Sequence, residues 1–200
     1  MLFRSELGDE ALREQAELFG FDSRFEIPLR AATSRFPENP DEAQTALSAI
    51  GQFDVRATAL QMAMVAASIG NGGRTMVPYL VQDIRAPDLT IVQTTKPQIF
   101  ADALRPSEAL ALTEMMVNAV DNGTGTNARI PGVKVAGKTG TAQTGNDRPT
   151  VAWFVAFAPA AAPQVAVAVM IEDANAAEVS GNGLAAPVAK AVIEAVLQRG

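Results

Sequence analysis

The sequence contains no cysteine and no histidine, and it has only one tryptophan and one tyrosine among its 200 residues. Without thiolate or imidazole groups, zinc-finger and iron–sulfur sites are excluded, and so are catalytic triads that use histidine as the base. The lack of cysteine leaves the redox compartment open, because exported and cytosolic proteins can both do without disulfides. Apolar runs such as 165–171 have the length of strands, not of membrane spans.

Charged residues are also sparse, at 19% of the chain, and the formal net charge is −6. The 16 lysines and arginines are scattered singly, so no basic cluster is available to neutralise phosphates, and we expect no nucleic-acid partner. Apolar residues make up 48% of the chain, which is enough to bury a core. The length suits one domain or a large part of one.

The order of the predicted elements indicates an α+β fold. Helical periodicity and helix-start signals predict helices at 7–19, 39–50, 58–69 and 107–122, with short strands at 77–84 and 91–95. A central strand within 133–143, two more at 151–158 and 165–171, and a closing helix at 184–197 follow. Short connections predict an antiparallel sheet with flanking helices, divided into a helical part of about 1–130 and a sheet with its closing helix at about 131–200.

The apolar residues also predict which helix faces are buried. The helix at 58–69 is almost wholly apolar, so we expect it in the domain centre. Asn39 is expected to cap the second helix, and Thr58 is expected to begin the third in a capping-box pattern with Gln61. The residues expected to face inward are Leu112, Met115, Met116, Ala119 and Val120 in the fourth helix, and Val188, Val192, Ile193 and Val196 in the closing helix.

Two chemistries fit the stretch at Lys138 and Thr139. Residues 132–139 match the phosphate-loop pattern G-x-x-x-x-G-K-[ST], which would indicate a nucleotide-binding protein. Such a loop needs a strand before its first glycine and a helix that begins at its lysine. Residues 127–131 do not read as a buried strand, and Gly140 with the later Gly145 and Pro149 opposes a helix. A phosphate loop therefore remains a remote alternative.

The second chemistry is serine acyl transfer, in which Lys-Thr-Gly lies on an edge strand. Such a strand can pair with an extended substrate peptide, and Gly140 lets that peptide come close to the backbone. Thr139 and Thr141 supply hydroxyls for a substrate carboxylate, the N–H of Thr141 can donate to a developing oxyanion, and Lys138 adds a positive charge. We therefore predict Lys138 and Thr141 as catalytic, and Lys138, Thr139, Gly140 and Thr141 as substrate-binding.

Longer strings around this stretch carry a family resemblance. They are residues 49–52 (AIGQ), 59–63 (ALQMA), 123–125 (GTG), 135–143 (VAGKTGTAQ) and 153–159 (WFVAFAP). In this order they resemble the transpeptidase domain of class B penicillin-binding proteins, and in particular the actinobacterial penicillin-binding protein A type. The resemblance covers nearly all of the chain and implies the serine β-lactamase/transpeptidase-like fold.

The resemblance also implies a function. Such domains cross-link peptidoglycan stem peptides: a serine attacks a D-Ala-D-Ala terminus, and β-lactams acylate the same serine. The expected partners are therefore stem peptides and β-lactams, with no cofactor and no metal. The expected location is the extracytoplasmic face of the cell membrane, anchored by a part of the protein outside this sequence.

The sequence departs from the family at two motifs. It contains no Ser-x-x-Lys, the motif that carries the nucleophile, and its only Ser-x-Asn, Ser180-Gly181-Asn182, follows Lys138 instead of preceding it. We interpret that tripeptide as a chance match, and the chain as the C-terminal portion of a transpeptidase domain, inactive alone. Without the family's preceding strands, 165–171 would have an open edge that favours self-association. A non-catalytic cell-wall scaffold with the same fold is the alternative.

Overall fold

The computed structural model describes residues 2–29, 31–142, 150–172 and 179–199. Its helices are α1 (Leu2–Leu18), α2 (Glu42–Ser48), α3 (Ala59–Gly70), α4 (Pro106–Asp121) and α5 (Ala186–Leu197). Its strands are β1 (Arg74–Met76), β2 (Asp83–Arg85), β3 (Ile91–Thr94), β4 (Ile99–Asp102), β5 (Ala136–Ala142), β6 (Val151–Ala158) and β7 (Val165–Ile171). A 3-10 turn η1 (Thr126–Ala128) precedes β5, and a π-helical turn η2 (Gly181–Ala185) leads into α5.

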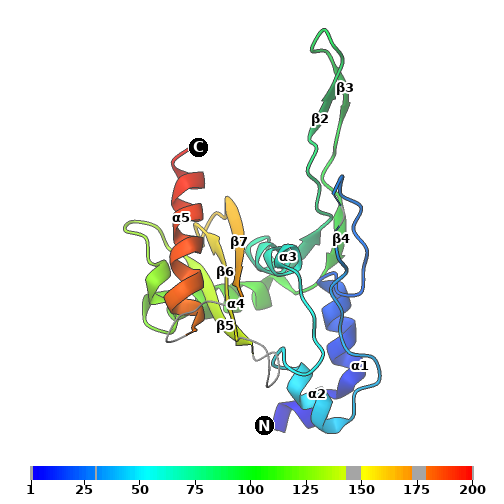
Figure 1. Ribbon diagram of the computed structural model, residues 1–200, viewed down its shortest axis with the longest axis vertical. Helices are drawn as coiled ribbons and strands as arrows, with labels where there is room; N and C mark the ends of the chain where they lie inside the picture. The colour runs from blue at the N-terminus through cyan, green and yellow to red at the C-terminus, as the bar shows by residue number, and fades with distance from the viewer. Residues whose placement is uncertain (1, 30, 143–149, 173–178, 200) are drawn as a thin grey trace.

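The central sheet has the strand order β5-β6-β7, with both pairs antiparallel, so the predicted meander is confirmed (Figure 1). Lys138 pairs with Val155, and Gly140 pairs with Trp153. Because neighbouring residues of a strand point to opposite faces, these four residues share one face of the sheet. Phe154, Thr139 and Thr141 belong to the other face.

Helix α5 covers the face that carries Phe154. This ring is fully buried and packs in one cluster with Val120, Ala189 and Ile193. The predicted inward face of α5 is therefore wrong apart from Ile193, because Val188, Val192 and Val196 are 41–45% exposed. Close packing of the helix on the sheet explains the difference, since the residues it presents to the strands are mostly alanines: Ala186 and Ala189.

Helices α3 and α4 cover only one end of the opposite face. Ala136 and Phe157 are fully buried there against Ala66 of α3 and Met116 of α4. The expectation of a wholly buried α3 is wrong, because only four of its residues are buried: Gln61, Met64, Ala66 and Ser68. In α4 the predicted inward residue Met115 is 59% exposed.

Buried polar groups connect α1 to α3 and to β1. The amide of Gln61 donates to the carbonyl of Phe19 at 2.6 Å. The Ser68 hydroxyl donates to Thr75 at 3.0 Å, and Thr75 donates in turn to the carbonyl of Leu18 at 3.0 Å. Ser68 and Thr75 are both at most 1% exposed, so these hydrogen bonds are formed away from water and fix the C-terminal end of α1.

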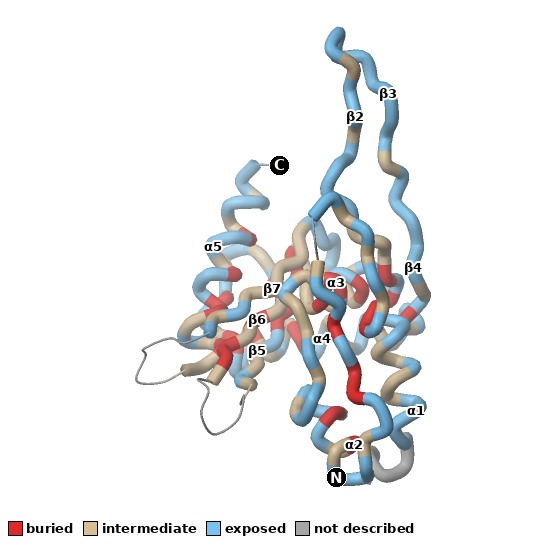
Figure 2. The backbone as a smooth tube through the Cα atoms, turned by 45° about the vertical axis from the view of Figure 1, so that its right-hand side comes forward, coloured by how far each residue is buried: buried red, intermediate tan, exposed pale blue. Residues whose placement is uncertain are grey.

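A long hairpin arm, 74–102, projects from this body (Figures 1 and 2). Its base is the β1–β4 pair, and its outer part is the β2–β3 pair. The segment 77–82, predicted as strand, is irregular, and only the end of that prediction overlaps β2. The sequence analysis did not predict the short strands β1 and β4. The predicted division into a helical part of about 1–130 and a sheet part of about 131–200 stays a prediction, and the first of these parts also contains the short strands β1 to β4.

Helix starts follow side-chain caps. Thr58 caps α3 as predicted, accepting the N–H of Gln61 at 3.1 Å. The predicted cap of α2 is wrong by two residues: Asp41, not Asn39, accepts the N–H of Gln44 at 2.8 Å, and Gln44 accepts the N–H of Asp41 in return. Asn39 instead adopts a left-handed conformation with φ 47°, which asparagine tolerates better than most residues.

Candidate functional site at the exposed end of strand β5

Lys138 lies within an extended strand. Its side chain is exposed, and its ammonium donates to the carbonyl of Thr139 at 2.6 Å. The residues from Ala136 to Ala142 all belong to β5, so no helix begins at the lysine. The phosphate-loop alternative is therefore wrong, because its lysine must stand at a helix N-terminus whose N–H groups bind the phosphate.

Gly140 is closely packed on both faces of the sheet. A Cβ atom added to it would lie 3.1 Å from Cβ of Trp153. On the other face, a Cβ atom added to Gly181 would lie 2.3 Å from the carbonyl oxygen of Trp153, and 2.9 and 3.1 Å from the backbone O and N of Gly140. The backbone of η2 therefore rests directly on the strand that carries 138–141, and both glycines permit this contact.

Thr139 has a hydrogen-bond partner that the sequence analysis did not predict. Its hydroxyl lies 2.8 Å from the hydroxyl of Thr124, in the loop between α4 and η1. This loop is attached to η2, because Asn127 donates two hydrogen bonds to Asn182: its backbone N–H to the side-chain oxygen and its side-chain amide to the carbonyl, both at 3.0 Å. The GTG string at 123–125 was the only sequence signal for this loop.

The tripeptide Ser180-Gly181-Asn182 therefore touches the candidate site, and its interpretation as a chance match needs correcting in part. It is not the Ser-x-Asn of the family, because it follows β7 and its Ser180 hydroxyl accepts the N–H of Gly183 at 3.0 Å. However, Gly181 packs on Gly140 and Asn182 holds the loop of Thr124. Its role is structural, at the base of β5.

The same part of β5, from Lys138 to Ala142, also borders a large apolar cleft of about 670 Å³. One wall is the uncovered part of the sheet, where Lys138, Trp153 and Met170 contribute lining residues. The facing walls come from α1, α3 and the segment 48–57, and include Phe19 and Met62. The candidate residues Lys138, Thr139, Gly140 and Thr141 all line this cleft, so the structure brings the four predicted positions together at its rim.

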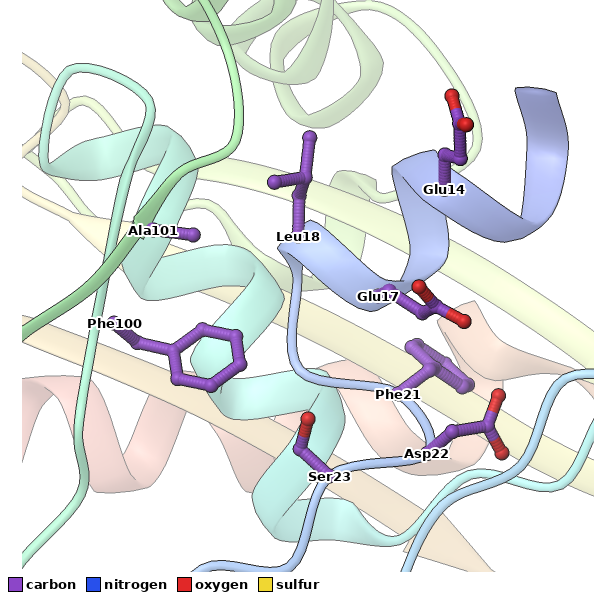
Figure 3. A pocket seen from close by; sticks show the side chains of 8 residues that line it. All are labelled: Glu14, Glu17, Leu18, Phe21, Asp22, Ser23, Phe100 and Ala101. Carbon is purple, nitrogen blue, oxygen red and sulfur yellow. The ribbon is translucent and has the colours of Figure 1, made fainter.

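A second cavity, of about 590 Å³, lies away from these residues, beside the C-terminal end of α1. Figure 3 shows the carboxylates of Glu17 and Asp22 beside the ring of Phe21, with the ring of Phe100 set apart from them. None of the residues 138–141 lines it. In the described part of the chain, no group of three or more acidic side chains is arranged to hold a metal ion, and no helix there has the length and apolarity that a membrane crossing requires.

The model of the penicillin-binding protein transpeptidase domain matches residues 1–194 of the sequence. The chain belongs to the penicillin-binding protein transpeptidase family. It is 46% identical over 196 residues to the peptidoglycan D,D-transpeptidase PbpA of Mycobacterium tuberculosis, and 43% identical over 198 residues to PbpA of Mycolicibacterium smegmatis. Each comparison covers 96% of this chain and 40% of the relative.

A solved transpeptidase structure agrees with the fold. Penicillin-binding protein A of M. tuberculosis, determined as a ceftriaxone acyl-enzyme complex, superimposes with a TM-score of 0.93 at 45% identity. That comparison covers 98% of this chain and 45% of the solved chain. The predicted family and fold class are thus confirmed. The chain spans less than half the length of these transpeptidases, and the roles of its individual site residues remain predictions.

Proposed function

We propose that residues 1–200 are the C-terminal portion of a peptidoglycan D,D-transpeptidase, in which β5 binds the stem peptide and β-lactams. The observation that carries this proposal is the position of Lys138, Thr139, Gly140 and Thr141 on the outermost strand of the sheet, at the rim of the apolar cleft. In the proposed reaction, a serine outside this sequence attacks the D-Ala-D-Ala carbonyl and forms an acyl-enzyme.

The direction of the peptide groups supports a role for Thr141. In an extended strand, the N–H and C=O of one residue point to the same edge of the strand, and residues two apart share that edge. The carbonyl of Thr139 accepts the ammonium of Lys138, so the N–H of Thr141 lies on the side of β5 that this ammonium reaches. We propose that this N–H donates to the oxyanion, and such a donor typically contributes about 10²–10³ in rate.

Lys138 is proposed to contribute charge at the same edge. Its exposed ammonium, bonded only to the neighbouring carbonyl among the described contacts of its side chain, can turn toward an anionic substrate group. The hydroxyls of Thr139 and Thr141 are proposed to bind the carboxylate of the stem peptide or β-lactam, because hydrogen bonds to charged groups contribute more than neutral ones.

A chimeric protein tests this function directly. In it, residues 1–200 replace the matching segment of M. tuberculosis PbpA, which supplies the remaining 60% or so of the length. We expect a fluorescent penicillin to label the chimera covalently and to leave the 200-residue chain unlabelled, because the sequence contains no Ser-x-x-Lys. A stable covalent label on the chain alone would refute our account of the nucleophile.

Lys138→Ala in the chimera should lower the acylation rate at least tenfold, while the fold is retained. Thr94→Val on the hairpin arm is the control, because its side chain lies far along the chain on a separate two-stranded sheet. If Lys138→Ala labels as fast as Thr94→Val, the proposed contribution of Lys138 to acylation is refuted. A properly folded chimera that is not labelled at all would favour the non-catalytic scaffold.

The open edge of the sheet leads to a further part of the proposal. Among the described strands, β7 pairs only with β6, and its side chains are apolar throughout. We propose that another part of the transpeptidase domain covers this edge, and that the isolated chain self-associates there. Light scattering over a range of concentrations tests this, with Met170→Lys as an edge variant expected to restore the monomer. A chain that is monomeric at every concentration contradicts it.

The proposed location is the extracytoplasmic face of the cell membrane, where peptidoglycan is cross-linked. A fusion of the full-length protein to a reporter that is active only outside the cytoplasm would test it. Reporter activity confined to the cytoplasm would contradict this part of the proposal.

A further inference from the structure

The loop between α4 and β5 packs beside the candidate site. The N–H of Gly125 donates to the carbonyl of Ala119 at 2.8 Å, and Ala128 is fully buried. A Cβ atom added to Gly125 would lie 3.2 Å from the ring of Phe154 and 3.3 Å from the Ala119 carbonyl. The loop is thus packed on Phe154, which is also the cross-strand partner of Thr139 on the same face of the sheet.

A second attachment comes from the turn that precedes α5. Asn182 bonds to both backbone and side chain of Asn127, and its amide also lies 3.4 Å from the hydroxyl of Thr126. Its neighbour Gly181 packs on the backbone of Gly140. The turn η2 therefore contacts both the loop that carries Thr124 and the strand that carries Thr139, although the two threonines are 15 residues apart in the sequence.

The number of protons that the Thr124 and Thr139 hydroxyls can donate determines the effect of this contact. A hydroxyl has one proton to donate and can accept at its lone pairs. If Thr139 donates its proton to a substrate carboxylate, then its 2.8 Å bond with Thr124 requires Thr124 to be the donor. Hydrogen bonds in such a chain strengthen one another, so the Thr139 hydroxyl becomes a better donor and is held in one rotamer.

We propose that Thr124 is a positioning residue of the transpeptidase site, which donates to Thr139 and thereby directs the Thr139 proton to the carboxylate of the substrate or β-lactam. This inference rests on the proposed function of β5. It assigns to the GTG loop a part in recognising the carboxylate, through Thr139 and without contact of its own with the reacting atoms.

The test uses the PbpA chimera and compares two probes. Penicillin G carries the carboxylate, and its methyl ester presents a neutral group at the same place. Thr124→Val keeps the shape of the side chain and removes the hydroxyl, whereas Thr124→Ser keeps the hydroxyl. The second-order acylation rate constant for penicillin G should fall about three- to tenfold in Thr124→Val, as expected for the loss of one hydrogen bond. It should stay within about twofold of the unsubstituted rate in Thr124→Ser, and the methyl ester should show no loss in Thr124→Val.

A double variant shows whether Thr124 acts through Thr139. If it does, adding Thr124→Val to Thr139→Val should cost nothing further, since interacting residues are non-additive. An equal loss for both probes, an additive double variant, or an unchanged Thr124→Val overturns the inference while the proposed function stands. An unsubstituted chimera that is folded but not acylated by penicillin G overturns both.

Discussion

Replacing Gly181 with alanine should destabilise the protein strongly, because the added methyl group would overlap backbone atoms of β5 and β6. The new Cβ would lie 2.3 Å from the Trp153 carbonyl oxygen and 2.9 Å from the Gly140 carbonyl oxygen, whereas real Cβ contacts essentially never fall below 3.0 Å. Neither strand can yield without disturbing the β5–β6 ladder. Overpacking typically costs about 1–3 kcal/mol, and we expect the upper end here, since no flexible side chain can move aside.

For a chain of this size, about 3 kcal/mol corresponds to a fall in melting temperature of roughly 6–12 °C. Thermal unfolding followed by circular dichroism measures this shift. Gly183→Ala is the matched control in the same turn, since its Cβ would meet only the Ser180 hydroxyl, at 3.0 Å, and a side chain can change rotamer. The reasoning is refuted if Gly181→Ala melts no lower than Gly183→Ala, because η2 then does not rest on the sheet.

Other substitutions test the rest of the fold. Phe154→Ala should cost about 3–5 kcal/mol in urea unfolding, because the ring is fully buried between α5 and the sheet; a cost below 1 kcal/mol would contradict that packing. Gln61→Leu leaves the Phe19 carbonyl without its partner and should cost about 1–3 kcal/mol; unchanged stability would mean that this bond is not formed in solution. At the start of α4, the side chain and N–H of Arg105 lower the pKa of the Glu108 carboxyl from its ordinary 4.5. A lowered pKa stabilises the fold above pH 4.5, and this contribution is lost as the pH falls through the lower folded-state value. Glu108→Gln should therefore be less stable than the unsubstituted protein at pH 7, and the gap should shrink as the pH falls below 4.5; a gap that does not change with pH would refute the charge-based explanation.

Periodicity and turn signals were sufficient to predict the main elements. The three central strands, the closing helix and the antiparallel connections follow from alternating apolar residues and short polar turns, which are local features. Thr58 as a cap is also local, since it needs only the next three residues. For the same reason, the position of Lys138 on a strand could be predicted from Gly140 and the neighbouring valines.

The errors arose where burial depends on a distant partner. Periodicity favoured Val188, Val192 and Val196 as the inner face of α5, but the sheet accepts alanines there, because the Phe154 ring already fills the space between helix and strands. No local pattern reports how closely two layers approach.

The partners of the candidate site were equally invisible in the sequence. Thr124 and Thr139 are 15 residues apart, and Asn127 and Asn182 are 55 apart. Their hydrogen bonds depend on how α4 and α5 pack, so they appear only when the elements are assembled. A GTG string and an apparently accidental Ser-Gly-Asn carried the only hints.

Strand β5 meets two different environments on the face that bears Lys138. Ala136, at its beginning, is sealed beneath α3 and α4, whereas Lys138, Gly140 and Ala142 border the cleft. Substitutions at the sealed end should therefore lower the stability of the fold, because they disturb close packing. Substitutions at Lys138 or Ala142, which border the cleft, should leave stability nearly unchanged and alter the cleft instead.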